Sequence, residues 1–131
     1  MLTGTETGTK TLDVLFIEDD EDMHLIWKLN LQPFPIRCTF ATHAEEGLRA
    51  AGSREWAAVV ADGQLMYGST SLPVLDHFRK RGGARHLIGV SSNELLRLEQ
   101  AKVCSHMADK IDVHHLLVKL LSLQPVATVI A

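Results

Sequence analysis

The chain has 131 residues, of which 46% are hydrophobic and 22% charged, and its formal net charge is −3 at pH 7. This length suits one domain and is too short for two of ordinary size. The composition lies outside the range of disordered chains, and the absence of a Lys/Arg-rich run argues against direct binding of nucleic acid. No stretch reaches the roughly 18 apolar residues of a membrane span, and the start lacks a signal-peptide core, so we expect no membrane contact and a cytoplasmic location.

Five short apolar runs rich in β-forming residues alternate with five stretches that have helical spacing. The predicted strands are residues 12–17, 36–40, 57–61, 86–91 and 103–108. The predicted helices are residues 21–31, 43–52, 72–81 and 93–102, and then a last helix whose apolar side chains recur from Val113 to Leu121. Residues 1–11 are expected to form a flexible leader and residues 123–131 a C-terminal tail.

The alternation of strands and helices predicts the fold class. Residues 12–122 leave about 22 residues for each unit, enough for one strand, one helix and two short loops. Nearly continuous apolar strands are typical of a parallel sheet that helices cover on both faces. We therefore expect a single α/β domain built on a doubly wound, five-stranded parallel sheet, (βα)5.

Polar residues that can carry chemistry follow the predicted strands. Glu18 and Asp19 come after the first strand, Asp62 after the third, Ser91 at the end of the fourth and Lys110 after the fifth. Because the carboxyl ends of parallel strands meet at one edge of the sheet, these side chains are expected to share a pocket.

The chemistry of this set indicates transfer of a phosphoryl group. Three crowded carboxylates repel one another unless a cation joins them, and Mg2+ prefers oxygen ligands. A carboxylate nucleophile with a metal, an ammonium and a hydroxyl nearby is suited to forming an aspartyl phosphate. The three acids that come next in the run, Asp20, Glu21 and Asp22, are expected to cap and charge the first helix.

The segments IEDDED, VVADG, IGVSS and ADKID, in this order, resemble the receiver domains of two-component response regulators over residues 12–122. The resemblance implies a flavodoxin-like sheet with the strand order 2-1-3-4-5. It also implies a role for each site residue: Asp62 as phosphoacceptor, Ser91 as switching hydroxyl, Lys110 as partner of the phosphoryl group, and Glu18, Asp19, Asp62 and the main-chain carbonyl of Gln64 as ligands of Mg2+.

The function that this resemblance implies is a stand-alone receiver rather than an enzyme acting on a separate substrate. A histidine kinase or phosphotransfer protein would supply the phosphoryl group, and a downstream protein partner would read the phosphorylated state. The resemblance also allows a homodimer.

Some residues depart from the receiver pattern. Met66 stands where receivers usually carry a proline, Met107 where an aromatic residue is common, and Ile111 where a proline usually follows the lysine. These departures leave open an alternative, a pseudo-receiver that binds proteins without being phosphorylated. A phosphatase of the haloacid dehalogenase type is disfavoured, because that family needs a second Asp where Gln64 stands.

Overall fold

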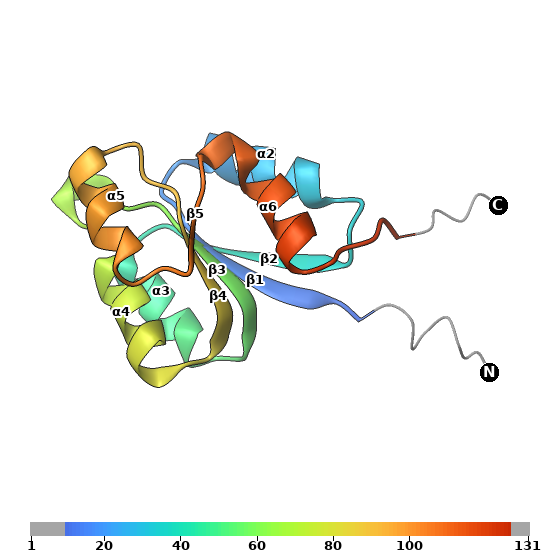
Figure 1. Cartoon of the computed structure of the whole chain (residues 1–131), viewed down its shortest axis with the longest axis horizontal. Coiled ribbons are helices and arrows are strands. Elements are labelled where there is room, and N and C mark those ends of the chain that lie inside the picture. The colour runs from blue at the N-terminus through green and yellow to red at the C-terminus, as the bar shows by residue number, and fades with distance from the viewer. Residues whose placement is uncertain (1–9, 127–131) are drawn as a thin grey trace.

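The structure is a computed structural model of the chain and describes residues 10–126. Its five strands are β1 (Leu12–Ile17), β2 (Ile36–Ala41), β3 (Trp56–Ala61), β4 (Ala84–Gly89) and β5 (His106–Met107). Every neighbouring pair is parallel, and the strand order is β2-β1-β3-β4-β5 (Figure 1). The predicted α/β fold and its strand order are confirmed.

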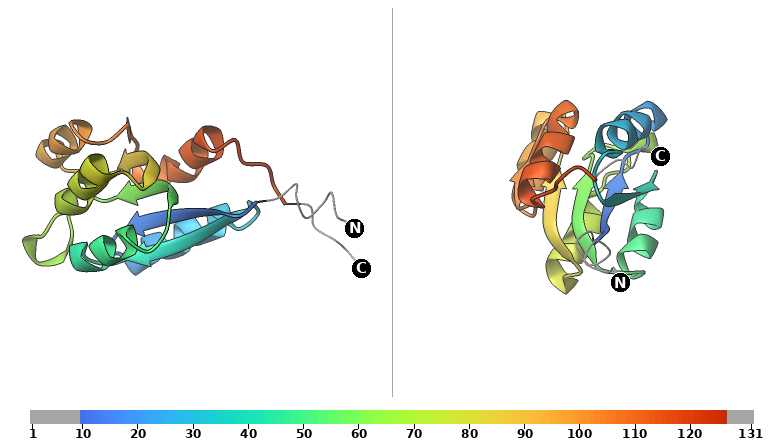
Figure 2. Two further views of the ribbon diagram at one scale, coloured as in Figure 1. Left: turned by 90° about the horizontal axis from the view of Figure 1, so that it is seen from below. Right: turned by 90° about the vertical axis from the view of Figure 1, so that its right-hand side faces the viewer.

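Within the described residues, five α-helices accompany the sheet. They are α2 (Glu21–Leu31), α3 (Ala44–Ala51), α4 (Leu72–Arg81), α5 (Glu94–Ala101) and α6 (Val113–Leu120), and two short 3-10 segments, η1 (Met66–Gly68) and η2 (Lys110–Asp112), lie between them. Helices α2 and α6 pack on one face of the sheet, and α3 and α4 on the other, as two further views of the molecule show (Figure 2). Helix α5 contacts β4, β5 and α4.

The core consists of two apolar clusters, one on each face of the sheet. All six residues of β3 are buried, as a central strand covered on both faces requires. On one face Trp27 of α2 packs against Phe16, with ring centroids 5.0 Å apart. On the other face Leu75 and Phe78 of α4 pack against the side of the sheet that carries Val59. Each such large side chain contributes about 1.5–3 kcal/mol through burial.

The structure corrects two strand boundaries. Strand β4 spans Ala84–Gly89 rather than 86–91, so Ser91 lies just beyond the strand and not at its end. Strand β5 has two residues rather than the predicted six. The main-chain N–H groups of Val103 and Cys104 both donate to the carbonyl of Gln100, and so they complete the end of α5 instead of joining the sheet.

The segment after α6 contacts the domain. Leu123 is buried, and the N–H of Val126 donates to the carbonyl of Pro33 at 2.7 Å. Most of the predicted leader (residues 1–9) and the end of the predicted tail (residues 127–131) lie outside the described residues. Within residues 10–126, no helix combines the length and the apolar character that crossing a membrane would require.

Candidate functional site

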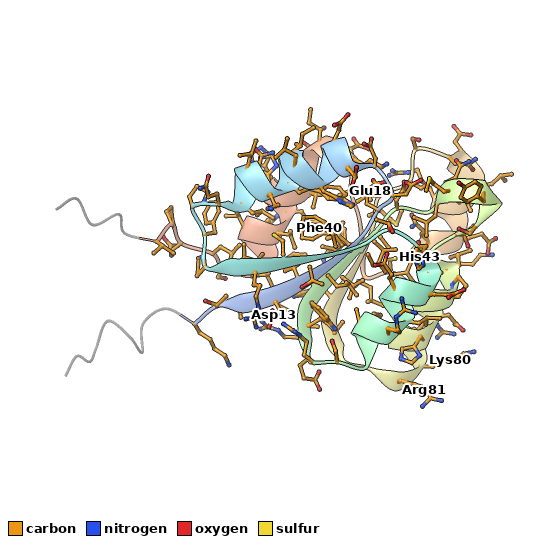
Figure 3. All side chains as sticks on the ribbon, turned by 180° about the vertical axis from the view of Figure 1, so that it is seen from behind. Asp13, Glu18, Phe40, His43, Lys80 and Arg81 are labelled. Carbon is orange, nitrogen blue, oxygen red and sulfur yellow. The ribbon has the colours of Figure 1, made fainter. Side chains whose placement is uncertain are left out.

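The site lies at the carboxyl edge of the sheet, where the loops that follow β1, β3, β4 and β5 meet. Main-chain hydrogen bonds extend the strand ladders into these loops: the N–H of Glu18 donates to Ala41 and that of Asp62 donates to Ile17, both at 2.9 Å. Glu18 follows β1 at this edge, whereas Asp13 lies near the start of the same strand (Figure 3). The loop residues that carry the chemistry are therefore fixed by the sheet.

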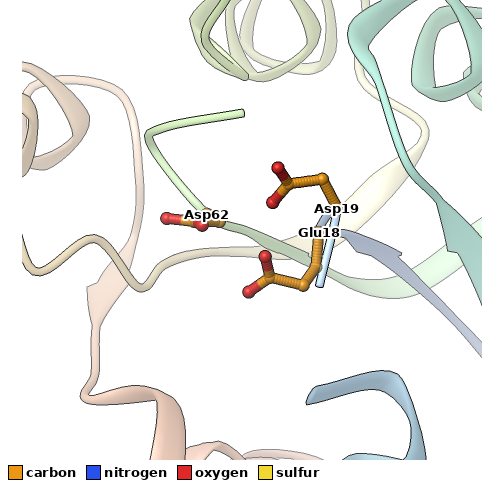
Figure 4. Close-up of side chains that lie close together, drawn as sticks. All are labelled: Glu18, Asp19 and Asp62. Carbon is orange, nitrogen blue, oxygen red and sulfur yellow. The ribbon is translucent and has the colours of Figure 1, made fainter. Parts of the chain in front are cut away.

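Three carboxylates converge at this edge. Glu18 is fully buried, Asp62 is nearly so, and Asp19 is half-buried. One oxygen of each lies within 4.8 Å of an oxygen of the other two, and the three side chains face a common space (Figure 4). Among the described residues, this is the one group of three or more acids, histidines or cysteines close enough to share a metal ion.

Lys110 completes the charged centre. Its ammonium donates a hydrogen bond to Asp62 Oδ2 at 2.9 Å and lies 2.7 Å from Glu18 Oε1. The main chain of Lys110 is also held, because the indole N–H of the buried Trp27 donates to its carbonyl at 2.9 Å. Two carboxylates and one indole thus fix the lysine at its two ends.

Burial and charge act on the ionisation of Glu18. Removal from water, followed by the negative charge of Asp62, raises the pKa of the Glu18 carboxyl to about 7, while the ammonium of Lys110 acts in the opposite direction. Burial by itself would lower the pKa of Lys110, but its contacts with Glu18 and Asp62 outweigh burial and raise it. Glu18 can therefore exchange a proton near neutral pH, while Lys110 stays charged.

One oxygen of Glu18 lacks a hydrogen bond. Oε2 accepts from the N–H of Asp20 at 3.2 Å, whereas Oε1, although close to the Lys110 ammonium, has no partner with hydrogen-bond geometry among the described residues. The charge of the Lys110 ammonium, 2.7 Å away, therefore offsets part of the cost of burying this oxygen. The three carboxylates and one ammonium also leave two formal negative charges when Glu18 is ionised. The residues present therefore fit a divalent cation that prefers oxygen ligands.

Ser91 lies beside the loop that carries Asp62. It is buried, and its Oγ accepts a hydrogen bond from the N–H of Asn93 at 3.1 Å. A methyl group on Gly63 would come within 2.8 Å of the Ser91 Cβ, so only glycine lets the loops after β3 and β4 approach so closely. The hydroxyl is thereby kept next to the residue that follows Asp62.

The second part of the acidic run caps and charges helix α2, as predicted. Asp20 is the N-cap of α2, and its side chain accepts from the N–H of Asp22 at 2.9 Å, while Glu21 and Asp22 lie in the first turn. Glu18 and Asp19 instead face the cluster. The N–H of Gln64 donates to Asp62 Oδ1 at 3.3 Å, and the role of its carbonyl as a metal ligand stays a prediction.

Three residues near the site were not singled out as site residues from the sequence. Trp27 holds Lys110, the ring of His24 hydrogen-bonds the carbonyl of Glu18, and Gln100 bonds the main chain of Ser91. Each contact joins a side chain on a helix to a main-chain atom of a strand-end loop. Residue type alone gives no sign of such a contact.

The departures from the receiver pattern lie around this centre. Met66 is exposed in a tight loop after Asp62, where Gln64 bridges to Thr70, and Met107 is half-buried in β5. Ile111 is exposed and follows Lys110 through a trans peptide bond. None of these three residues interrupts the contacts between Lys110 and the carboxylates.

Known structures share this architecture. The receiver domain of an HD-domain-containing protein from Pseudomonas fluorescens Pf-5 matches with a TM-score of 0.73 and 17% identity, over 86% of this chain and 93% of that one. The response regulator TrrA from Thermotoga maritima, determined in complex with Mg2+ and BeF, matches with a TM-score of 0.71 and 21% identity, over 84% of this chain and 99% of that one. The chain has the fold of response regulator receiver domains.

A third receiver resembles this chain to a similar degree. It belongs to a sensor histidine kinase from Pseudomonas aeruginosa PAO1, has a magnesium ion coordinated in its active-site cleft, and matches with a TM-score of 0.70 and 14% identity, over 86% of this chain and 99% of that one. No family profile and no curated protein sequence matches the chain. The likeness therefore lies in the receiver fold and not in overall sequence.

Proposed function

We propose that this receiver domain accepts a phosphoryl group on Asp62 from the phosphohistidine of a histidine kinase or phosphotransfer protein, and that a downstream protein partner reads the result. The observation that carries the proposal is the centre formed by Asp62, Lys110 and the two acids after β1. Four residues from three separate segments meet there with the charges that phosphoryl transfer to a carboxylate requires.

In the transfer step, a carboxylate oxygen of Asp62 attacks the phosphorus of the donor phosphohistidine. An O–P bond forms, the N–P bond of the donor breaks, and the departing imidazole nitrogen keeps the electron pair and takes up a proton. Lys110, which already contacts Asp62 Oδ2, neutralises charge on the phosphoryl oxygens. The Oγ of Ser91 accepts from Asn93 and keeps its own proton to donate to a phosphoryl oxygen.

The acidic cluster supports Mg2+ as the cofactor of this step. Glu18, Asp19, Asp62 and the main-chain carbonyl of Gln64 would hold the ion, and the ion would neutralise part of the phosphoryl charge. Such an ion would balance the two formal negative charges that the three carboxylates and Lys110 leave when Glu18 is ionised.

Helix α2 offers a surface for the phosphoryl donor. Leu25, Ile26 and Leu29 are exposed on it, and Leu29 follows Leu25 by four residues and Ile26 by three, so the three share one side of the helix. Asp22 in the first turn lines a pocket with Asp19 of the acidic cluster. An apolar stripe next to the acceptor site is suited to docking a helix of a donor protein.

The alternative function, a phosphorylation-independent pseudo-receiver, is favoured by Met66, Met107 and Ile111 at positions where receivers usually carry other residues. It would leave the buried acids and Lys110 without a role beyond the fold. One experiment separates the two functions.

The experiment exposes the protein to acetyl phosphate, or to beryllofluoride, with Mg2+. We expect a mass increase of one phosphoryl group with acetyl phosphate and a change in amide chemical shifts around Asp62 with beryllofluoride. Asp62→Asn should abolish both, and Asp20→Asn, which alters a neighbouring acid outside the cluster, should abolish neither. A wild-type protein that responds to neither reagent would establish the pseudo-receiver.

A further inference from the structure

Helix α5 places a fully buried amide side chain against the candidate site. Gln100 has no exposed surface, although it lies on a helix of eight residues whose apolar Leu95 and Leu98 are 75% and 64% exposed. Its Nε2 donates to the carbonyl of Ala61 at 2.9 Å, and its Oε1 accepts from the N–H of Ser91 at 3.4 Å. The donor and acceptor types of these two partners fix the orientation of the amide.

These two bonds join the ends of two strands. Ala61 is the last residue of β3 and precedes Asp62, and its carbonyl also accepts from the N–H of Val90 at 3.0 Å. The N–H of Ser91, one residue further on, donates to Gln100 rather than to β3. Gln100 thus continues the link between β3 and β4 past the point where the strands themselves stop.

Space for this amide comes from Gly89. A methyl group there would lie 2.7 Å from Gln100 Oε1 and 2.8 Å from the sulfur of Met107. The glycine in β4 therefore leaves the space that the amide from α5 and the methionine in β5 occupy.

Further bonds connect Ser91 to α5. The guanidinium of Arg97 donates to the Ser91 carbonyl at 2.9 Å, and Asn93, the N-cap of α5, donates its N–H to the Ser91 hydroxyl at 3.1 Å. The N–H, the carbonyl and the hydroxyl of Ser91 are each bonded to α5 or its cap. Movement of Ser91 toward a group on Asp62 must therefore strain or move α5.

We propose that Gln100 is a positioning residue, which holds the main chain of Ala61 and Ser91 so that Asp62 and the Ser91 hydroxyl contact the same phosphoryl group, and which couples that contact to helix α5. The inference rests on the proposed function of Asp62. Gln100 would connect the site to the surface of helix α5 without an aromatic residue at position 107, where this chain has Met107.

The test compares wild type with Gln100→Leu, which keeps the size of the side chain and removes both hydrogen bonds. Beryllofluoride with Mg2+ should shift the amide signals of α5 in wild type. In Gln100→Leu these α5 shifts should be lost and phosphorylation by acetyl phosphate should slow by about tenfold or more, because the hydroxyl is no longer held in place. Mg2+ affinity, followed by amide shifts of Glu18 and Asp19 in a titration, should stay within about twofold, since Gln100 contacts neither acid.

Two controls separate positioning from stability. Gln124→Leu makes the same chemical change at an exposed position and should behave as wild type. Leu31→Val, in the core at the far end of α2, should lower the unfolding temperature while keeping the α5 response. If Gln100→Leu does not fold, Gly89→Ala serves in its place, because the added methyl group would displace the same amide. It should also weaken the α5 response, by which we mean the shift of the α5 amide signals on addition of beryllofluoride.

A conservative change supplies a rescue. Gln100→Glu introduces a carboxyl that, when protonated, can donate one hydrogen bond and accept another as the glutamine does. The α5 response of this variant, divided by that of wild type at the same pH, should rise as the pH falls from 8 to 6. If Gln100 serves stability alone, the unfolding temperature of this variant should rise as the pH falls, while the α5 response of the folded protein should stay constant.

Each result decides the inference. A wild-type α5 response in Gln100→Leu, or a loss no larger than that in Leu31→Val, would overturn it. A wild-type protein that fails to respond to beryllofluoride would overturn the proposed function first, and the role of Gln100 with it. A selective loss in Gln100→Leu, with Mg2+ binding intact, supports both.

Discussion

Lys110 depends on a tryptophan that lies far from it in the sequence. The indole of Trp27 reaches its carbonyl from 83 residues away, while the ammonium contacts Asp62 and Glu18. Asp62 is therefore connected through one residue to a buried indole, and we expect a change of charge at Asp62 to be transmitted along these contacts. The other tryptophan, Trp56, begins β3 at the opposite edge of the sheet, and its indole bonds to Ala50.

The two tryptophans predict different fluorescence responses. In Trp56→Phe, whose remaining indole is Trp27, addition of Mg2+ and beryllofluoride should change the emission. Trp27→Phe should lose that change and about 1–3 kcal/mol of stability, because the Lys110 carbonyl loses its donor and the smaller ring leaves a cavity. Equal responses from the two variants in a fluorescence titration would contradict the transmission through Lys110.

At the scale of elements, the ends of the helices show where glycine is required. Gly82 ends α4 with φ 77° and ψ −160°, a conformation that other residues avoid, and its N–H donates to Phe78 at 2.7 Å. Gly52 ends α3 with an ordinary φ of −87° and open space around it. The same substitution should therefore have opposite consequences at these two positions.

Gly82→Ala should destabilise the protein by about 1–3 kcal/mol, because alanine must adopt a strained conformation. Gly52→Ala should be neutral or stabilise by up to about 1 kcal/mol, since it only restricts the unfolded chain. Urea denaturation of the two variants measures the difference. A Gly82→Ala protein as stable as Gly52→Ala would show that the end of α4 adapts to a side chain.

The elements also show how far sequence reasoning reaches. Apolar runs predicted both ends of β1, and helical spacing predicted α2 and α4 over their full observed ranges. Leu95 and Leu98 give residues 93–102 their helical spacing, and yet both are exposed in α5 while Gln100 is buried. Periodicity assigns apolar residues to the core, and it cannot recognise an amide whose partners are main-chain groups of other strands.

The site was predictable to a similar extent. Glu18, Asp19, Asp62 and Lys110 meet because parallel strands end at one edge, which is a property of the fold class. The supporting contacts of Trp27, His24 and Gln100 depend on where each helix lies on the sheet. Helix placement is decided by packing, and the sequence pattern contains no direct signal for it.

For the molecule as a whole, the ionisation of Glu18 makes the free energy of unfolding depend on pH when no cation is bound. The pKa of Glu18 is raised from an ordinary 4.5 to about 7 in the folded protein. Between these values the folded state binds more protons than the unfolded state, so this group makes the protein less stable as the pH rises toward 7. The pKa values of Asp13 and Glu46 are lowered by their partners, so these two residues change the pH dependence of stability only at more acidic pH.

Glu18→Gln should remove this dependence. Without Mg2+, the free energy of unfolding of the variant should increase relative to that of wild type by up to about 1 kcal/mol for each unit of pH between 5 and 7. The difference between the two proteins should level off above pH 7. Thermal or urea unfolding across this range measures it. A constant difference between the two proteins would mean that Glu18 ionises at its ordinary pKa.

Mg2+ should reverse the order of the two proteins. A divalent cation binds the ionised carboxylates, so its stabilisation of wild type should grow from pH 5 to 7. At a fixed pH, this stabilisation should increase with the logarithm of the ratio of Mg2+ concentration to the dissociation constant. Glu18→Gln should lose most of this stabilisation, because a neutral amide replaces a ligand charge. At pH 8 the variant should therefore be the more stable protein without Mg2+ and the less stable one at saturating Mg2+. A variant more stable than wild type under both conditions would remove Glu18 from the metal site while leaving Asp19 and Asp62 as the ligands to test.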